Sequence, residues 1–311
     1  VAQDFAEFEF IVIDDGSTDA TPAILQRWAS RDPRFVILRN ERNLGISTSL
    51  NKGLDAAHGA YIARQDADDI SEPGRFRAQV ELLDAQSDVV LVSTNYHVID
   101  GAGNILQTTQ LDHPSALIEF LLLFSNALGG HSQVMFRRNA IRDLGAYSTE
   151  FLCSQDYELW TRVVRRGRIV VLPQPGMRYR VHDSRITVRE SDRQIEESWG
   201  ITRRMLNAYL GRELSDAELC AIASVWRQHL PSTRPDLASA VFAEAYRVFA
   251  RHADASLRRR ARTVAAQRFA ITGAAMLRQG SVIGALRHFA YSLRWDPFGL
   301  AKVVLRRLRA R

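Results

Sequence analysis

Short apolar runs alternate with amphipathic stretches through the first part of the chain. Residues 8–13 (Phe-Glu-Phe-Ile-Val-Ile) and 35–38 (Phe-Val-Ile-Leu) are nearly unbroken apolar runs, a pattern typical of parallel strands buried on both faces. A third strand is predicted at residues 60–63, and helices are predicted from Pro22 and from Ser49. This alternation predicts a doubly wound α/β layer, in which ligands bind at the carboxyl ends of the strands.

Further strands and helices are predicted up to residue 190. A helix over residues 156–166 would bury its apolar face. The other predicted strands are residues 89–93, 131–136, 169–172 and 177–181, with a hairpin turn at 100–104. From about residue 192 the chain consists of helix formers with few glycines. We therefore expect an α/β domain over residues 1–190 and an all-α region over residues 191–311, which includes one weakly tetratricopeptide-like helical hairpin at 265–297.

The composition is that of an ordinary soluble globular protein, with 46% hydrophobic residues. No run approaches the roughly 18 apolar residues of a membrane-spanning helix. Residues 116–128 come nearest, but Glu119 and Asn126 interrupt them, so this stretch predicts a buried helix. The two cysteines, Cys153 and Cys220, have no disulfide or metal-binding pattern around them, which favours a reducing, cytoplasmic location.

The net charge of +6 is unevenly distributed along the chain. Residues 251–311 contain fourteen arginines and lysines against two acidic residues, whereas the first 250 residues are net negative. Residues 300–311 mix apolar and basic positions, as in an amphipathic helix suited to the anionic inner face of the cell membrane. A solubilising arginine-rich face is the alternative to peripheral membrane contact. Nucleic acid is not an expected partner, because aromatic residues are sparse among the basic ones.

The densest candidate chemistry is the run Arg64-Gln65-Asp66-Ala67-Asp68-Asp69, which follows the third predicted strand. Alternation along an extended chain places Asp66 and Asp68 on one face. Two carboxylates held this close repel each other, so the pair favours a site in which a cation or a donor-rich ligand lies between them. A solvated acidic loop that caps the next helix is the alternative.

Five short segments stand out by their order and spacing. They are residues 10–19 (Phe-Ile-Val-Ile-Asp-Asp-Gly-Ser-Thr-Asp), 43–45 (Asn-Leu-Gly), 51–53 (Asn-Lys-Gly), 66–69 (Asp-Ala-Asp-Asp) and 155–160 (Gln-Asp-Tyr-Glu-Leu-Trp). Together they resemble the ordered motifs of the family-2 inverting glycosyltransferases of the GT-A fold, over about residues 4–185. The resemblance implies a mostly parallel sheet with helices on both faces, followed here by an all-α region.

The resemblance also implies roles for individual residues. In that family the Asp-Asp-Gly-Ser turn contacts the base of a nucleotide-sugar donor, a role that falls on Asp14 and Asp15. The two aspartates of the Asp-x-Asp motif contact the ribose and hold Mg²⁺ or Mn²⁺ on the diphosphate, which implies Asp66 and Asp68. The second residue of the family's Glu/Gln-Asp motif is the catalytic base, here Asp156. A helix N-cap is the alternative for that residue.

Four further residues are candidates for the donor and metal sites. In related enzymes a residue after the last strand reaches the diphosphate or completes the metal shell, which implies a phosphate contact for Arg180 and a third metal ligand in His182. A surface histidine is the alternative for His182. Arg64 would stack on the donor base or pair with Asp66. Asn43 belongs to a motif that we assign to donor binding.

The expected function is metal-dependent, inverting transfer of a sugar from a nucleotide-diphosphate donor to a hydroxyl of a glycan or lipid-linked acceptor, as in polysaccharide and cell-envelope biosynthesis. One alternative is a catalytically silent GT-A-like scaffold or interaction protein. Another is a sugar nucleotidyltransferase. The chain opens at Val1, where members of the family have a first strand, so we also expect an incomplete sheet and weak donor binding.

Overall fold

The computed structural model describes residues 3–182, 190–227 and 234–298. The chain divides into a sheet unit, formed by residues 1–115 and 128–197, and a helical unit, formed by residues 116–127 and 198–311.

The sequence assigns residues 116–127 to the α/β domain, but the structure places them in the helical unit. Within that unit the Phe124 ring stacks on Trp226 with centroids 4.6 Å apart, and the Phe120 ring stacks on Phe249 at 4.4 Å. These aromatic contacts bury the segment, so the prediction that it is buried rather than membrane-spanning is confirmed.

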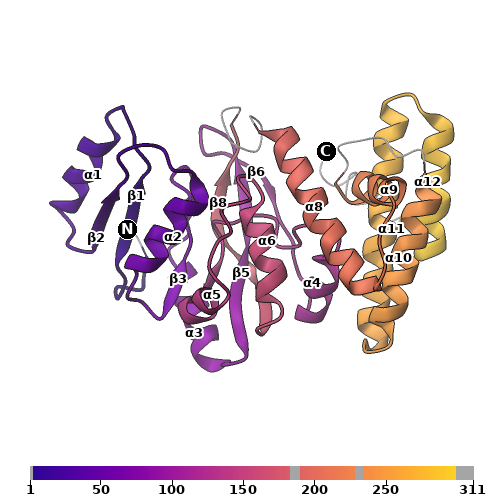
Figure 1. Ribbon diagram of the computed structural model, residues 1–311, viewed down its shortest axis with the longest axis horizontal. Coiled ribbons are helices and arrows are strands. Elements are labelled where there is room, and N and C mark those ends of the chain that lie inside the picture. The colour runs from indigo at the N-terminus through magenta and orange to yellow at the C-terminus, as the bar shows by residue number, and fades with distance from the viewer. Residues whose placement is uncertain (1–2, 183–189, 228–233, 299–311) are drawn as a thin grey trace. The chain divides into compact units, whose positions relative to one another are not determined.

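A pair of parallel strands opens the sheet unit, and a helix packs on each of them (Figure 1). On the first helix, Trp28 stacks on Phe35 with ring centroids 6.1 Å apart. On the second, Gly53 lies against Ile13, because a Cβ at position 53 would be only 2.8 Å from the Ile13 Cδ1. The elements are β1 (Phe10–Asp14), α1 (Thr21–Ala29), β2 (Phe35–Arg39) and α2 (Ile46–Ala56).

The second sheet of this unit has six strands in the order β3-β7-β5-β8-β4, with β6 paired to β5. Only β5 and β8 run parallel, and the other pairs are antiparallel. The sheet is therefore mixed rather than mostly parallel, in part because the predicted tight turn at residues 100–104 joins β5 to β6, and such a turn joins only antiparallel strands. The strands are β3 (Tyr61–Ala63), β4 (Ile70–Ser71), β5 (Val89–Ile99), β6 (Ile105–Thr108), β7 (Met135–Arg137) and β8 (Arg168–Arg180).

Two strands differ from their predicted extents. Strand β8 is continuous where the sequence predicts two strands, because shifts of register along β5 accommodate its prolines, and the side-chain amide of Asn95 donates to the Pro173 carbonyl at 2.9 Å. The strand predicted at residues 131–136 begins only at Met135. Residues 131–134 instead form a turn beside the candidate site.

Helices cover the six-stranded sheet and bury its apolar side chains (Figure 1). Leu83, Val89, Val92 and Met135 form a core cluster between the helix that follows β4 and the sheet. Trp160 is completely buried, as the apolar face predicted for its helix requires. These helices are α3 (Arg75–Ala85), α5 (Arg138–Asp143) and α6 (Gln155–Val163).

The helical unit contains two helices that pack as an antiparallel pair, α11 and α12, joined by a turn at Gly280 with φ +83° (Figure 1). This pair coincides with the hairpin predicted at residues 265–297. No helix in the described parts of the chain is long and apolar enough to cross a membrane. The amphipathic helix predicted at residues 300–311 lies outside the described residues. The helices are α4 (Ser115–Leu121), α8 (Ser191–Leu210), α9 (Asp216–Arg227), α10 (Pro235–Ala250), α11 (Ala255–Arg278) and α12 (Val282–Trp295), of which α4 and α8 begin in the sheet unit.

Candidate functional site

The turn after β1 is fixed by a buried carboxylate and a glycine. Asp14 Oδ1 accepts the Ser17 N–H at 2.8 Å, and its Oδ2 lies 3.4 Å from Arg39 Nε. Gly16 has φ +77°, and a Cβ there would lie 2.6 Å from the backbone carbon of Arg42. Only glycine fits both the backbone angle and the space, so the Asp-Asp-Gly turn is held tightly against the loop after β2.

Asp15 is bonded to that same loop. Its carboxylate accepts the Leu44 N–H and the Asn40 side-chain amide, both at 2.8 Å, and the Gly45 N–H at 3.0 Å. Partial burial alone would raise the pKa of Asp15, but these hydrogen bonds outweigh it and lower the pKa. Asn43 Oδ1 also accepts the Gly45 N–H, at 3.1 Å. Both side chains therefore shape the loop that enters α2, and their contact with a donor base stays a prediction.

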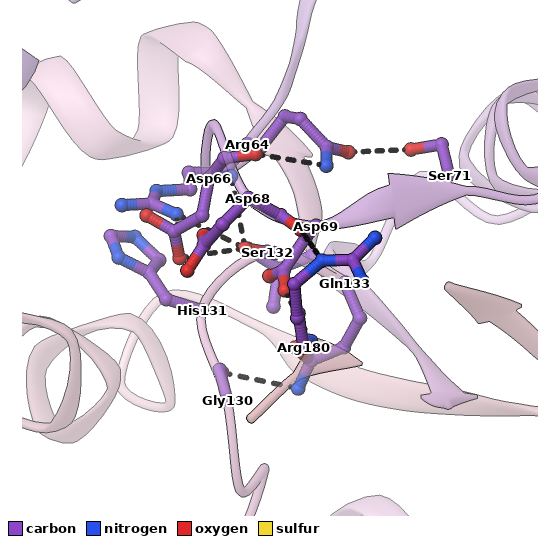
Figure 2. A network of polar contacts seen from close by, with 12 residues as sticks. Arg64, Asp66, Asp68, Asp69, Ser71, Gly130, His131, Ser132, Gln133 and Arg180 are labelled. Carbon is purple, nitrogen blue, oxygen red and sulfur yellow. Dashed lines mark hydrogen bonds and ion pairs between the residues drawn. The ribbon is translucent and has the colours of Figure 1, made fainter. Parts of the chain in front are cut away.

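Asp66 is bound to Arg64 and Ser132 at the end of β3 (Figure 2). The buried Arg64 guanidinium pairs with Asp66 Oδ2 and donates to the Ser132 hydroxyl at 3.1 Å. That hydroxyl donates to Asp66 Oδ2 at 2.7 Å and accepts the Asp66 N–H at 3.0 Å. Of the two interpretations of Arg64, the structure shows the ion pair with Asp66. The bonds converge on one carboxylate oxygen, Oδ2.

Asp68 lies beside His182. Its Oδ2 is 2.9 Å from His182 Nε2, and both side chains are partly exposed. Within the described ranges no three His, Cys, Asp or Glu side chains form a closed metal cluster. A carboxylate oxygen beside an imidazole nitrogen is instead a half-site. Its carboxylate suits Mg²⁺ or Mn²⁺, since Mg²⁺ commonly binds through one or two carboxylates together with water and substrate phosphates. The residues present therefore fit the expected cation.

Residues 66–69 form a turn, here called the aspartate turn. Asp69 and Arg180 connect it to the end of β8 (Figure 2). Asp69 Oδ1 accepts the Arg180 N–H at 2.9 Å, while its buried Oδ2 has no hydrogen-bond partner among the described residues. Burial, with the nearby charges of Asp66 and Asp68, raises the pKa of Asp69 to about 6. The Arg180 guanidinium donates to the carbonyls of Asp68 at 3.0 Å, Asp100 at 3.0 Å and Gly101 at 2.9 Å. Arg180 thus braces the turn through main-chain oxygens, and its phosphate contact stays a prediction.

A fully buried arginine supports this turn through hydrogen bonds to its flanking residues. Arg75, in the first turn of α3, donates to the carbonyls of Arg64 at 2.8 Å and Val134 at 3.0 Å, and to the side chains of Ser71, Gln65 and Gln79. No carboxylate accepts any of these bonds. Burial and the neighbouring charge of Arg64 lower the pKa of Arg75 to about 9. A charge this deeply buried is tolerated because each donor group has a partner.

We expect Arg75→Met to lower the free energy of unfolding by about 3 kcal/mol, because it leaves several buried acceptors without a donor. Denaturant titration followed by circular dichroism measures this. Arg77→Met, on the same helix, is the matched control. Arg77 makes an exposed ion pair with Asp4, whose loss costs under about 1 kcal/mol. Equal losses in the two variants would contradict a structural role for Arg75.

Asp156 lies in the first turn of α6, where the helix dipole favours a negative charge. The loop before the helix is held by Glu197, whose carboxylate accepts the N–H groups of Leu152, Cys153 and Ser154, each at 2.9 Å. Asp156 Oδ1 accepts the Tyr157 N–H at 2.6 Å. The backbone that carries Asp156 is therefore fixed by a residue about forty positions away in the sequence.

A buried tyrosine and histidine lie beside Ser132, the partner of Asp66. The Tyr147 hydroxyl and His131 Nε2 are 2.8 Å apart, and both residues are buried. Burial raises the pKa of Tyr147, and the charges of Asp156 and Asp66 raise it further. Burial and the nearby Arg64 keep the pKa of His131 well below its ordinary value, so its ring is neutral. One hydroxyl is thus within electrostatic reach of both the Asp-x-Asp motif and Asp156.

The structure also identifies residues to which the sequence pattern gives no role. They are Asp69, Arg75, Ser132, Tyr147 and Glu197. The polar run His131-Ser132-Gln133 at the start of a predicted strand was an available signal, since a buried strand does not accommodate polar side chains without partners.

Comparison with known proteins identifies relatives of the chain. A family model described as glycosyl transferase family 2 matches residues 1–145. An uncharacterized glycosyltransferase of Haemophilus influenzae is 29% identical over 224 residues, which cover 68% of each chain. The amylovoran biosynthesis glycosyltransferase AmsE of Erwinia amylovora is 30% identical over 58% of this chain and 67% of that protein. The chain spans 56–68% of the length of five curated relatives that it matches.

Solved structures share the fold. The mannosyltransferase PcManGT from Pyrobaculum calidifontis, in complex with GDP-Man and Mn²⁺, superposes with a TM-score of 0.53 at 18% identity, covering 96% of this chain and 80% of that one. At this identity the likeness shows the fold alone, and it confirms the GT-A architecture expected from the sequence. From the family match, the AmsE relationship and the fold together, the chain belongs to glycosyl transferase family 2 and is a glycosyltransferase.

Proposed function

We propose that this protein transfers a sugar, with inversion, from a nucleotide-diphosphate donor to a hydroxyl of a glycan or lipid-linked acceptor, and that a divalent cation is required. The observation that carries the proposal is a chain of contacts between the donor side and the helix of the candidate base. Ser132 is bonded to Asp66, and the adjacent His131 packs against Trp160 with ring centroids 5.7 Å apart. Trp160 lies on α6, the helix whose first turn contains Asp156. The donor-side carboxylate and the candidate base are therefore held by elements that pack on one another, as a common reaction centre requires.

In this mechanism Asp156 is the general base. It takes the proton from the acceptor hydroxyl, and the oxygen attacks the anomeric carbon from the side opposite the diphosphate. The helix dipole at Asp156 favours its carboxylate form before the reaction. A single base and a single displacement lead to inversion.

The donor end of the site is assigned to the aspartate turn. Asp66 Oδ1, which its bonds to Arg64 and Ser132 leave available, would accept a ribose hydroxyl. Asp68 and His182 would hold the cation. When bound there, Mg²⁺ or Mn²⁺ supplies positive charge that stabilises the leaving diphosphate. Support for a cation and a nucleotide-sugar donor comes from PcManGT, whose structure contains Mn²⁺ and GDP-Man.

The acceptor class rests on the relatives. AmsE is named for amylovoran biosynthesis, and ExoO of Rhizobium meliloti for succinoglycan biosynthesis. Both names indicate polysaccharide assembly, so we propose a growing glycan, free or lipid-linked, as the acceptor. A silent scaffold is less favoured, because such a protein has no need to keep Asp68 beside His182 or to hold the start of α6 through Glu197.

A panel of nucleotide sugars with hydroxyl acceptors, assayed with Mn²⁺ and with EDTA, tests the proposal. We expect one donor to give product only in the presence of the cation, with an anomeric configuration opposite to that of the donor, as read by NMR. A product of retained configuration, or equal yields in EDTA, would contradict the mechanism. Conversion of the donor, with added pyrophosphate, to nucleoside triphosphate and sugar 1-phosphate would instead indicate nucleotidyltransferase chemistry.

A further inference from the structure

Helix α12 presents an apolar face to solvent. Val282, Leu286 and Leu293 are 54%, 62% and 47% exposed and, at spacings of four and seven residues, form one stripe along the helix. Ile283, which is 71% exposed, lies beside that stripe. Four large apolar side chains on one face of a fourteen-residue helix are more than the scattered exposure expected of a soluble surface.

This face is separate from the one that α12 uses within its own unit. Ala285, His288 and Ser292 are the buried residues of the helix, and they lie about 100° around the helix from the stripe. The contact with α11 is close, because a Cβ at Gly273 would be 2.9 Å from the Phe289 ring. Helix α12 packs on α11 through its buried side. The outward apolar stripe therefore has no packing partner in the described part of this unit.

The charged residues of α12 are both arginines. Arg287 and Arg294 are exposed and follow Leu286 and Leu293 by one residue, so they line one edge of the face. Together α11 and α12 contain eight arginines and no acidic residue. Arginine side chains at this position can lie along an apolar surface while their guanidinium groups reach anionic headgroups.

We propose that the outward face of α12 docks on an anionic lipid bilayer, with its apolar stripe among the acyl chains near the headgroups and its arginines on the lipid phosphates. Charge complementarity selects this occupant. A second copy of the chain, placed face to face, would bring the same arginines together. The surface precedes residues 300–311, to which the sequence pattern alone assigns membrane contact. A glycosyltransferase held in this way would work beside lipid-linked acceptors.

Vesicle flotation of the full chain tests the proposal without donor or metal, so its outcome is independent of sugar transfer. We expect binding to phosphatidylglycerol vesicles, weaker binding at high salt, and little binding to phosphatidylcholine alone. The double variant Ile283→Asp/Leu286→Asp should reduce binding about tenfold or more, since it places charges in the apolar stripe. Both side chains are exposed, and unchanged circular dichroism would verify the fold.

Ile105→Asp/Leu106→Asp is the matched control, since these two apolar residues of β6 are comparably exposed, at 54% and 60%. Its vesicle binding should equal that of the unmodified chain. Equal flotation of the α12 variant and the unmodified chain would overturn the proposal, as would a loss confined to a variant without residues 299–311. Lipid-independent dimers that disappear in the α12 variant would show that a second copy covers the face.

Discussion

Asp156→Asn should lower kcat about 10³-fold while donor affinity stays unchanged, the largest effect that we expect of any single substitution. The amide keeps the size of the side chain and its acceptor oxygen for the Tyr157 N–H, but it cannot take a proton from the acceptor hydroxyl. Initial rates under saturating donor, with donor affinity from calorimetry, separate chemistry from binding.

Glu150→Gln is the control for Asp156, because Glu150 is an exposed acid in the loop that precedes α6. It should retain the full rate. If Asp156→Asn kept activity within a few fold of the unmodified enzyme, another group would have to be the base. If it lost donor affinity instead, Asp156 would belong to the donor site.

Asp68→Asn should lower activity about 10²-fold and shift the Mn²⁺ concentration needed for half-maximal rate upward. The amide is a weaker metal ligand than the carboxylate, and it carries no negative charge to offset the positive charge of the cation. His182→Gln should have a smaller effect, about tenfold, because it removes one neutral ligand. Titration of Mn²⁺ against the rate, together with nucleoside-diphosphate binding at each Mn²⁺ concentration, measures both effects.

The control for this pair is Asp55→Asn, an exposed carboxylate near the end of α2. Its Mn²⁺ dependence should match that of the unmodified chain. An Asp68→Asn enzyme with normal Mn²⁺ dependence would mean that the cation binds elsewhere or is not needed. If Asp68→Asn lost its Mn²⁺ dependence while His182→Gln remained fully active, Asp68 would be a metal ligand and His182 would not.

The alternation of apolar runs and helices predicted the strands that carry the site. Strands β1 and β2 lie where unbroken apolar runs occur, since a strand buried on both faces requires such a run. Strand direction was less predictable. Whether a strand runs parallel or antiparallel depends on its neighbours, and β3 pairs with β7, a strand more than seventy residues later.

In the candidate site, too, the sequence predicted the positions of residues better than their contacts. The motifs placed carboxylates at strand and helix ends, but they gave Asp66 and Asp68 equivalent positions. In the structure Asp66 is neutralised by Arg64 and bonded to Ser132, whereas Asp68 pairs with His182. These different partners make one carboxylate suited to a donor hydroxyl and the other to a cation.

The sequence by itself determined the family, the acidic motifs and their order along the chain, because these depend on residue type and local spacing. Only the tertiary structure decided which oxygen atoms are left unbonded, since Ser132 and His182 lie 66 and 114 residues from the aspartates they contact. It also decided that Arg75 is a buried support and that α12 has an uncovered face. Contacts over such separations arise from packing of the whole unit, which no local pattern encodes.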